Sequence, residues 1–439
     1  MTTFSATDPA AQRVLGRVRD AALMPIAEDV IHGRRLDAQQ GMTLFRTSDI
    51  WTVCSLADLV RRRLNGDVAY YNVNRHLNYS NICALSCKFC AFHRKRDQEG
   101  AYQYDLDDIR DEAIKAIEAG ATEMHIVGGL HPRLPFDYYL DMLRTIRETA
   151  PRVHIKAFTA VEIVHLARMA KRGREKEEGI RWVIQQLKEA GLGSMPGGGA
   201  EVFDDRVHSE THRGKISGDQ WLIVHRLAHE EGLNTNATML YGHVETFEDR
   251  IRHMQLLRQE QDRTLLEWAH AQGACVQTAI NHEGEEHQAV VLTDPATAAA
   301  KLQPTSETCS TGFYQTLIPL PFIPDDSELE HLPGPMGLEN LRTMCVSRLM
   351  LDNFPHMKAF WIMQTLEMAQ FMLQNGADDI DGTVVWYDIT KVEGAGTHQE
   401  VTQLDLQRAA REAGFHPVER DTLYRTVHRD GREWSVDED

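Results

Sequence analysis

Short runs of apolar and β-branched residues alternate along the chain with longer segments whose apolar positions recur at helical spacing. The short runs suit strands buried on both faces, and the longer segments suit helices with one buried face. Strands that alternate with helices form parallel sheets, so the pattern predicts an α/β fold of the (β/α)8 TIM-barrel type. The predicted strands cover residues 69–79, 122–129, 152–159, 191–196, 235–241, 313–320, 356–363 and 378–385.

The chain extends beyond this alternating region at both ends. Residues 1–68 include the stretches A-A-Q-R-V-L-G-R-V-R-D-A-A-L and S-L-A-D-L-V-R-R-R-L, whose helical spacing predicts an N-terminal helical cap. We expect the barrel over residues 69–390. Residues 391–439 are expected to form a C-terminal helix and tail that pack on the barrel. One large domain with these additions accounts for the chain of 439 residues.

One segment interrupts the alternation between the fifth helix and the sixth strand. From about residue 264 to 311 the chain has a predicted hairpin around His282-Glu283-Gly284, followed by a link rich in Ala, Thr and Pro. A connection at this point of a barrel emerges on the face opposite the active site. We therefore expect an insertion that serves stability or self-association, with Cys275 and Cys309 as ordinary thiols.

Composition narrows the classes of function. The chain has 47 Lys and Arg against 65 Asp and Glu, and the resulting net charge of −18 opposes binding to nucleic acid. The N-terminus lacks the pattern of a secretory signal, and no stretch approaches about 18 uninterrupted apolar residues. We therefore expect a cytoplasmic protein that does not span a membrane. Its seven unevenly spaced cysteines do not resemble a disulfide framework.

Three of those cysteines lie close together after the first predicted strand. The stretch N-I-C-A-L-S-C-K-F-C-A-F-H, residues 81–93, holds Cys83, Cys87 and Cys90. Three thiolates on one loop can bind three irons of a cubane cluster and leave the fourth iron open for a reactant. The alternative is a zinc site completed by His93, although zinc ligands generally come in two pairs separated by a longer loop.

This loop in front of a barrel resembles the signature of the radical S-adenosylmethionine (radical SAM) enzymes, over about residues 72–390. The resemblance implies that the three cysteines bind a [4Fe-4S] cluster and that S-adenosyl-L-methionine chelates the open iron. Phe89 matches an aromatic position that lies against the cofactor. Gly128 and Gly129, which end the second strand, match an element that contacts the methionine amino group.

Further segments resemble one family of these enzymes, the aminofutalosine (aminodeoxyfutalosine) synthases of the futalosine route to menaquinone. The segments N-R-H-L-N-Y-S-N-I-C, G-G-L-H-P-R-L-P-F-D-Y-Y, H-I-K-A-F-T-A-V-E-I and P-G-G-G-A-E-V-F are shared with sister enzymes, whereas H-R-G-K and T-M-L-Y-G-H-V-E-T favour the synthases. The resemblance implies that an adenosyl radical adds to the enolpyruvyl double bond of 3-[(1-carboxyvinyl)oxy]benzoate. Rearrangement and decarboxylation then give aminofutalosine. S-adenosylmethionine is consumed, and flavodoxin or ferredoxin is the expected type of electron donor.

Charged residues after the predicted strands are candidates for ligand binding. Because the implied substrate has two carboxylates, Arg213 and Lys215 are expected to bind them, Arg213 as a fork and Lys215 as a point charge; the alternative is a solvated pair on the surface. Glu162 and Glu201 are expected to hold the ribose hydroxyls or the methionine ammonium of the cofactor. The alternative for each is a carboxylate that only favours a helix N-terminus.

Histidines and strand residues complete the candidate site. His131 and His243 follow the second and fifth strands, where a proton donor or a carboxylate ligand would lie, and they join Arg213 as catalytic candidates. Asp381 and Thr383, on the eighth strand, are expected to be polar contacts of the cofactor, with core hydrogen bonding as the alternative.

Two features depart from the family pattern. The insertion is longer than expected, and Trp386 and Tyr387 stand after the eighth strand where a more charged run is usual. If the loop that carries Trp386 and Tyr387 reaches the substrate, it affects which substrate the protein accepts. Neither feature touches the cysteine loop.

Two other functions stay open on the sequence. One is a sister radical enzyme that abstracts hydrogen, either dehypoxanthine futalosine cyclase or one radical half of deazaflavin synthase. The other is a zinc-stabilised binding protein without radical chemistry. The sequence also leaves open whether the chain forms a homo-oligomer.

Overall fold

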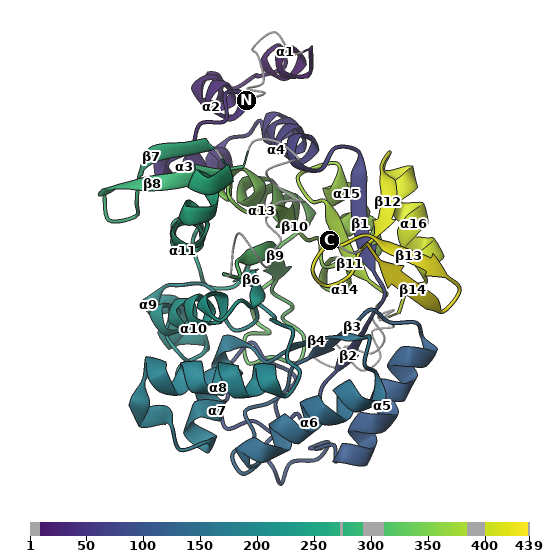
Figure 1. The fold of residues 1–439 in the computed structure, drawn as a ribbon. Helices are drawn as coiled ribbons and strands as arrows, with labels where there is room; N and C mark the ends of the chain where they lie inside the picture. The colour runs from purple at the N-terminus through teal and green to yellow at the C-terminus, as the bar shows by residue number, and fades with distance from the viewer. Residues whose placement is uncertain (1–8, 273–274, 293–310, 384–399, 438–439) are drawn as a thin grey trace.

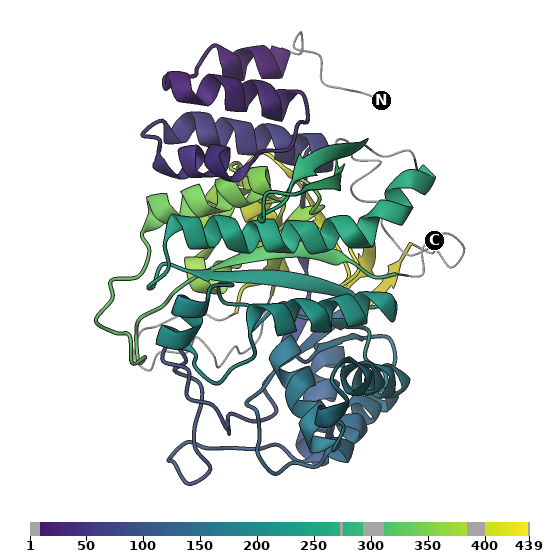
Figure 2. The ribbon, with the colours of Figure 1, turned by 90° about the vertical axis from the view of Figure 1, so that its left-hand side faces the viewer.

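The computed structural model describes residues 9–272, 275–292, 311–383 and 400–437. A curled sheet of parallel strands lies at its centre, with helices packed on the outside (Figures 1 and 2). None of the helices in these ranges combines the length and the apolar character that crossing a bilayer requires.

A seven-stranded parallel sheet forms most of the barrel. Across the sheet the strands are β10 (His356–Met357), β9 (Tyr314–Pro321), β6 (Asn234–Tyr241), β5 (Ser194–Met195), β4 (His154–Ala157), β3 (Glu123–Ile126) and β2 (Asn74–Leu77). The helices of the outer layer are α5 (Leu106–Glu118), α6 (Phe136–Thr149), α7 (Ala160–Met169), α8 (Glu177–Glu189), α9 (Asp205–Thr211), α10 (Gly218–Glu230), α11 (Phe247–Gln272), α13 (Gly337–Met350), α14 (Trp361–Gln364) and α15 (Leu366–Leu373), with the short 3-10 helix η2 (Gly173–Glu175) between α7 and α8.

Two further strands close the ring. β1 (Val68–Asn72) precedes β2 and pairs in parallel with β11 (Asp379–Gly382), and β11 meets β10 through a bridge between Lys358 and Asp379. The Thr383 amide donates to the Asn72 carbonyl at 3.2 Å. The extended segment 68–77 thus pairs with β11 at one end and with β3 at the other. This arrangement confirms the predicted (β/α)8 fold.

Every predicted strand has a counterpart in the barrel, but the fourth and the seventh are reduced to two residues each. The apolar run 356–363 continues as a strand only to Met357, and α14 begins at Trp361. Ala359, Phe360 and Trp361 are buried nevertheless. Apolar runs this short do not distinguish a buried strand from a buried helix, so the pattern over-extended the strand.

Helices and strands from the two ends of the chain pack on the barrel. The N-terminal elements are α1 (Pro9–Leu15), η1 (Ala21–Leu23), α2 (Met24–Ile31), α3 (Ala38–Arg46) and α4 (Ile50–Asn65), which stack at one end of the molecule (Figure 2). α4 packs on α13 and shares the main hydrophobic core with it. The C-terminal elements are α16 (Gln403–Glu412), β12 (His416–Glu419), β13 (Val427–Asp430) and β14 (Glu433–Val436), and β12 pairs in parallel with β1.

The predicted hairpin is present as β7 (Cys275–Ile280) and β8 (Glu286–Val291), and it lies beside α3 and α11 (Figure 1). α11 continues to Gln272, so the helix extends beyond residue 264, where we expected the insertion to begin. None of the described hairpin residues lines the central cavity. Cys309, Trp386 and Tyr387 lie outside the described residues.

A buried arginine ties the hairpin to the N-terminal helices. Arg35, in the link between α2 and α3, donates to Asp262 of α11 at 2.9 Å, to Asp352 at 2.6 Å and to the Val290 carbonyl of β8 at 2.9 Å. Asp262 also accepts the Val290 amide at 2.9 Å. One guanidinium therefore joins three segments that are far apart in the sequence.

Replacing Arg35 by Ala should destabilise the chain by about 3 kcal/mol, because it leaves the buried Asp262 and the partly buried Asp352 without this cation. Urea unfolding measures the change, and hydrogen exchange should rise in β7 and β8. Arg34→Ala is the matched control, since Arg34 pairs with Asp29 near the surface and should change stability by less than about 1 kcal/mol. Equal effects of the two substitutions would contradict the role of Arg35.

Candidate functional site

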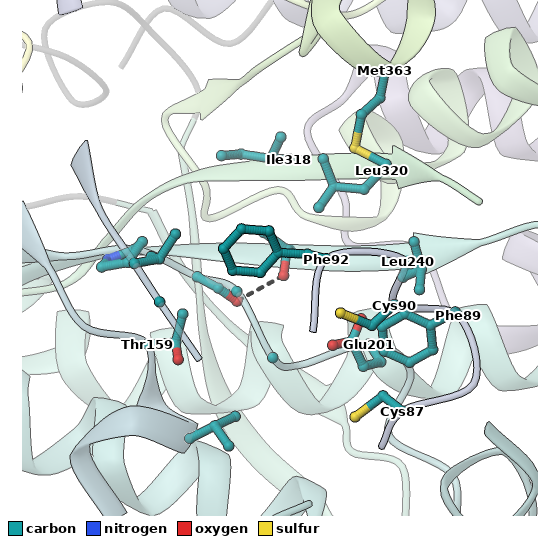
Figure 3. Close-up of a pocket in the computed structure, with 18 of the residues that line it drawn as sticks. Cys87, Phe89, Cys90, Phe92, Thr159, Glu201, Leu240, Ile318, Leu320 and Met363 are labelled. Atoms are coloured by element: carbon teal, nitrogen blue, oxygen red, sulfur yellow. Dashed lines mark hydrogen bonds between the residues drawn. The ribbon is translucent and has the colours of Figure 1, made fainter. Parts of the chain in front are cut away.

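A cavity of about 310 Å³ opens among the loops that follow the barrel strands and reaches into the barrel. In Figure 3, Cys87, Phe89, Cys90 and Glu201 lie together on one side, with Ile318, Leu320 and Met363 across from them. Most of the site residues predicted from sequence line this cavity, namely Cys83, Cys87, Phe89, Cys90, Gly128, Gly129, Glu162, Glu201, Lys215 and Asp381.

The cysteine loop is fixed by backbone hydrogen bonds. The Cys83 amide donates to the Arg94 carbonyl at 3.0 Å, and the Cys90 amide donates to the Cys87 carbonyl at 3.1 Å. The Lys95 ammonium donates to the Cys83 carbonyl at 3.1 Å. All three cysteines are free thiols and line the same cavity.

Burial of two of these thiols, Cys83 and Cys87, opposes their ionisation to thiolates. Burial raises the pKa of Cys87 to about 11 and also raises the pKa of Cys83. A metal centre deprotonates coordinating thiols, so the cavity suits one. Within the described residues, no three His, Cys, Asp or Glu side chains converge closely enough to hold a single metal ion. A cubane attaches each thiolate to a different iron, so this arrangement suits a cluster better than one zinc ion.

The zinc alternative would use His93, which also lines the cavity. Its Nδ1 lies 2.9 Å from the Cys90 carbonyl oxygen, so the loop backbone orients the ring. Such a contact leaves Nε2 available and so does not decide between zinc and a cluster; a cluster held by the three thiols alone would leave one iron for a ligand that the chain does not provide.

Lys215 and Glu201 lie beside the thiols. Lys215 forms an ion pair with Glu201, and its ammonium lies 5.3 Å from the centroid of the Phe89 ring. Burial alone would lower the pKa of Lys215, but Glu201 and the Cys87 thiol together raise it. Glu201 has a φ of 48°, a conformation that non-glycine residues adopt rarely and that often occurs at functional sites.

Gly128 and Gly129 allow the end of β3 to contact the cysteine loop. A Cβ atom on Gly129 would lie 2.4 Å from the Ile82 carbonyl oxygen, and one on Gly128 would lie 2.6 Å from the Tyr79 ring. The Gly129 amide donates to the Ser80 carbonyl at 2.7 Å. Close packing therefore explains why both positions are glycine without any ligand. Their predicted contact with the cofactor stays a prediction.

Glu162 is buried in a dense set of hydrogen bonds. It accepts bonds from the Gly128 amide at 3.0 Å, the Tyr79 hydroxyl at 2.9 Å, and the amide and hydroxyl of Thr159, each at 2.8 Å. Thr159 and Glu162 form the capping box that begins α7. Burial nevertheless raises the pKa of Glu162 to about 7. The carboxylate fixes Gly128, and its predicted bond to the cofactor is untested by these contacts.

Asp381 and Thr383 lie at the end of β11. Asp381 is buried, accepts a hydrogen bond from the Lys358 ammonium at 2.7 Å, and has a φ of 69°. The Thr383 hydroxyl donates to the Asn74 carbonyl at 3.3 Å. Asp381 lines the cavity, whereas Thr383 helps to close the barrel and is not among the described residues that line it.

The three candidates proposed for catalysis are not among the described residues that line the cavity. Arg213 is exposed to solvent. His131 Nδ1 accepts the Leu134 amide at 3.0 Å, which fixes the turn before α6. The His243 ring lies 3.1 Å from the Leu240 carbonyl oxygen and 3.2 Å from the Glu245 carboxylate. Their catalytic roles remain predictions.

Sequence reasoning missed four basic residues that line the inner part of the cavity, namely His76, His125, Lys156 and Lys358. Three of them lie within strands, whereas the candidates came mainly from the loops after the strands. A signal was present for three of them, because M-H-I, I-K-A and M-K-A place a basic residue between apolar neighbours in runs expected to be buried.

Cys87→Ala should abolish cluster binding, because the two remaining thiolates cannot hold three irons. Iron and sulfide content and the absorbance at about 400 nm of anaerobically purified protein measure the loss. Cys275→Ala and Cys309→Ala are the controls and should retain the iron of the parent protein. Equal iron loss in all three variants would contradict the assignment.

Comparison with known proteins agrees with this geometry. Residues 77–257 match the Radical SAM superfamily, and residues 310–431 match the CofH/MqnC C-terminal region. Aminodeoxyfutalosine synthase of Thermus thermophilus is 40% identical over 93% of this chain and 97% of its own length. The 5-amino-6-(D-ribitylamino)uracil–L-tyrosine 4-hydroxyphenyl transferase of Methanopyrus kandleri is 31% identical over 92% and 95%.

Among solved structures, methylornithine synthase (PylB) superposes with a TM-score of 0.61, covering 89% of this chain and 96% of that one at 14% identity. This likeness concerns the fold alone. The family match and the full-length relatives together show that the chain belongs to the radical SAM superfamily, in the group that includes the aminodeoxyfutalosine synthases.

Proposed function

We propose that the chain catalyses the reaction of an aminodeoxyfutalosine synthase in menaquinone biosynthesis. In this reaction the 5′-deoxyadenosyl group of S-adenosylmethionine is joined to 3-[(1-carboxyvinyl)oxy]benzoate, with rearrangement and decarboxylation, to give aminofutalosine. The observation that carries the proposal is the 40% identity to such a synthase over nearly the whole of both chains. The cavity with three free thiols supplies a site of the required kind.

The chain's own residues bind, orient and shield the reactants. Cys83, Cys87 and Cys90 would hold the [4Fe-4S] cluster, which supplies, with S-adenosylmethionine, the adenosyl radical that forms the new bond. The wall opposite the thiols is apolar and contains Ile318, Leu320 and Met363 (Figure 3). Apolar side chains there exclude water from the reacting groups, which protects a reactive radical.

A sister radical enzyme is the second candidate, because the 4-hydroxyphenyl transferase also matches the full length. Its identity to this chain is 31%, compared with 40% for the synthase. The difference favours the synthase. Free thiols in the cavity suit a reducing compartment, so we place the reaction in the cytoplasm, with flavodoxin or ferredoxin as the electron donor.

An anaerobic assay tests the proposal. The reconstituted protein, a low-potential reductant, S-adenosylmethionine and the enolpyruvyl benzoate should give one product that contains the adenosyl carbon and has lost one carboxyl group, detected by mass. Cys87→Ala protein should give none. Free 5′-deoxyadenosine in stoichiometric amount, with no adduct, would favour a sister enzyme. A colourless protein with one bound zinc would favour the binding protein.

A further inference from the structure

The inner end of the cavity is basic. We call His76, His125, Lys156 and Lys358 the basic floor; all four line the same cavity as the three thiols. They come from four parts of the barrel, namely β2, β3, β4 and the residue that follows β10. The thiols lie on the loop that leaves β2, whereas His76 lies within that strand, so the floor is deeper in the barrel than the thiols.

Strand register brings these side chains to one level. His76 pairs with His125 across β2 and β3, and His125 pairs with Lys156 across β3 and β4. The two imidazole rings stack with centroids 4.5 Å apart and planes within 3°. Lys358 is bridged to β11, whose Asp381 also lines the cavity. The floor therefore brings two ammonium groups and two imidazole rings together on one cavity.

Such a surface is unusual inside a barrel, where branched apolar residues normally fill the interior. Lys156 pairs with Glu123 at 2.6 Å, and Lys358 pairs with Asp381 at 2.7 Å, all of them buried. Well-packed apolar residues often stabilise a protein as much as a buried ion pair does, so stability alone does not account for these pairs. Their position on a cavity indicates a ligand.

The floor has hydrogen-bond donors available for an anion. An ammonium group has three donors, and one carboxylate partner within hydrogen-bond distance does not use them all. Burial lowers the pKa of His76 to about 4; the Asp381 and Glu123 carboxylates act to raise this pKa, and the Lys156 and Lys358 ammonium groups act to lower it. Burial also lowers the pKa of His125. The neutral rings limit the positive charge of the empty floor, and the donors for an anion are those of the two ammonium groups.

We propose that the basic floor binds the ring carboxylate of the benzoate substrate. The aromatic ring then lies along the apolar wall of Ile318 and Leu320, and the enolpyruvyl group points toward the thiols. This orientation follows because the bond-forming carbon of S-adenosylmethionine must be held at the thiol end. The proposal rests on the proposed function and assigns the ring carboxylate to Lys156 and Lys358 in place of Arg213, which is exposed to solvent.

Binding of two ligands to the anaerobic holoenzyme without reductant tests the proposal independently of turnover. Equilibrium dialysis compares the substrate with its ring carboxamide analogue. The parent protein should bind the carboxylate at least about 10-fold more tightly, as expected for a charge-assisted hydrogen bond in a buried site. Equal affinities in the parent protein would overturn the proposal whatever the variants do.

The test variant is Glu123→Gln/Lys156→Met, because removing the lysine alone would leave a buried carboxylate unpaired. It should bind the two ligands equally while keeping its affinity for S-adenosylmethionine and its cluster absorbance. If it does not fold, Lys358→Met/Asp381→Asn tests the same loss of preference between the two ligands, with cluster absorbance alone as its check on folding, because Asp381 is itself a candidate contact of the cofactor. Lys115→Met is the matched control, since Lys115 pairs with Glu112 at 2.7 Å on α5, away from the cavity, and should keep the parent preference.

An unchanged preference for the carboxylate in a folded floor variant would overturn the proposal and leave the proposed function intact. A parent protein that binds neither compound, and gives no adduct in the product assay, would overturn the proposed function itself. The two failures are therefore distinguishable.

Discussion

The contact between the cysteine loop and the end of β3 is the interaction on which the rest of the site depends. The Gly129 amide donates to the Ser80 carbonyl, and the Ala84 amide donates to the Leu130 carbonyl, so the loop is bound on both sides of Ile82. The approach is so close that a side chain at Gly129 would collide with the Ile82 backbone. Glu162 then fixes Gly128 from α7. The direction of the thiols is set by these neighbours, and the loop does not need to fold independently.

The barrel interior contains buried charged side chains, whereas an ordinary hydrophobic core is apolar. Glu123, Lys156, Lys358 and Asp381 are buried and paired, and burying each ion carries a large desolvation penalty that the pairing offsets only partly. The surrounding helices supply the apolar burial that stabilises such an interior. The polar interior and the apolar wall together form a cavity with one charged end and one thiol end, which suits a substrate that has a carboxylate at one end and a reactive double bond at the other.

Much of this architecture could be predicted from the sequence, because burial on both faces imposes a strong pattern on parallel strands. The hairpin was equally visible, since His282-Glu283-Gly284 lies between two apolar runs. The thiols were found because three cysteines within eight positions, in a chain without a disulfide framework, are typical of a metal or cluster site. Lys156 and Lys358 were missed because a charged residue inside a buried run is visible in the sequence, but only the strand register shows which side chains it meets and that they share a cavity. Arg213 shows the limit of the same reasoning, since its place after a strand does not say whether the side chain faces a site or solvent; it is exposed here, and its role stays a prediction.

The central claim is that three thiols bind the cluster and leave one iron for an external ligand. Mössbauer spectroscopy of the iron-57 protein, with and without S-adenosylmethionine, tests this claim most directly. The account predicts one iron in four that differs from the others and whose isomer shift changes when S-adenosylmethionine binds. Irons that are all equivalent and insensitive to S-adenosylmethionine, or a protein with no inorganic sulfide, would contradict it.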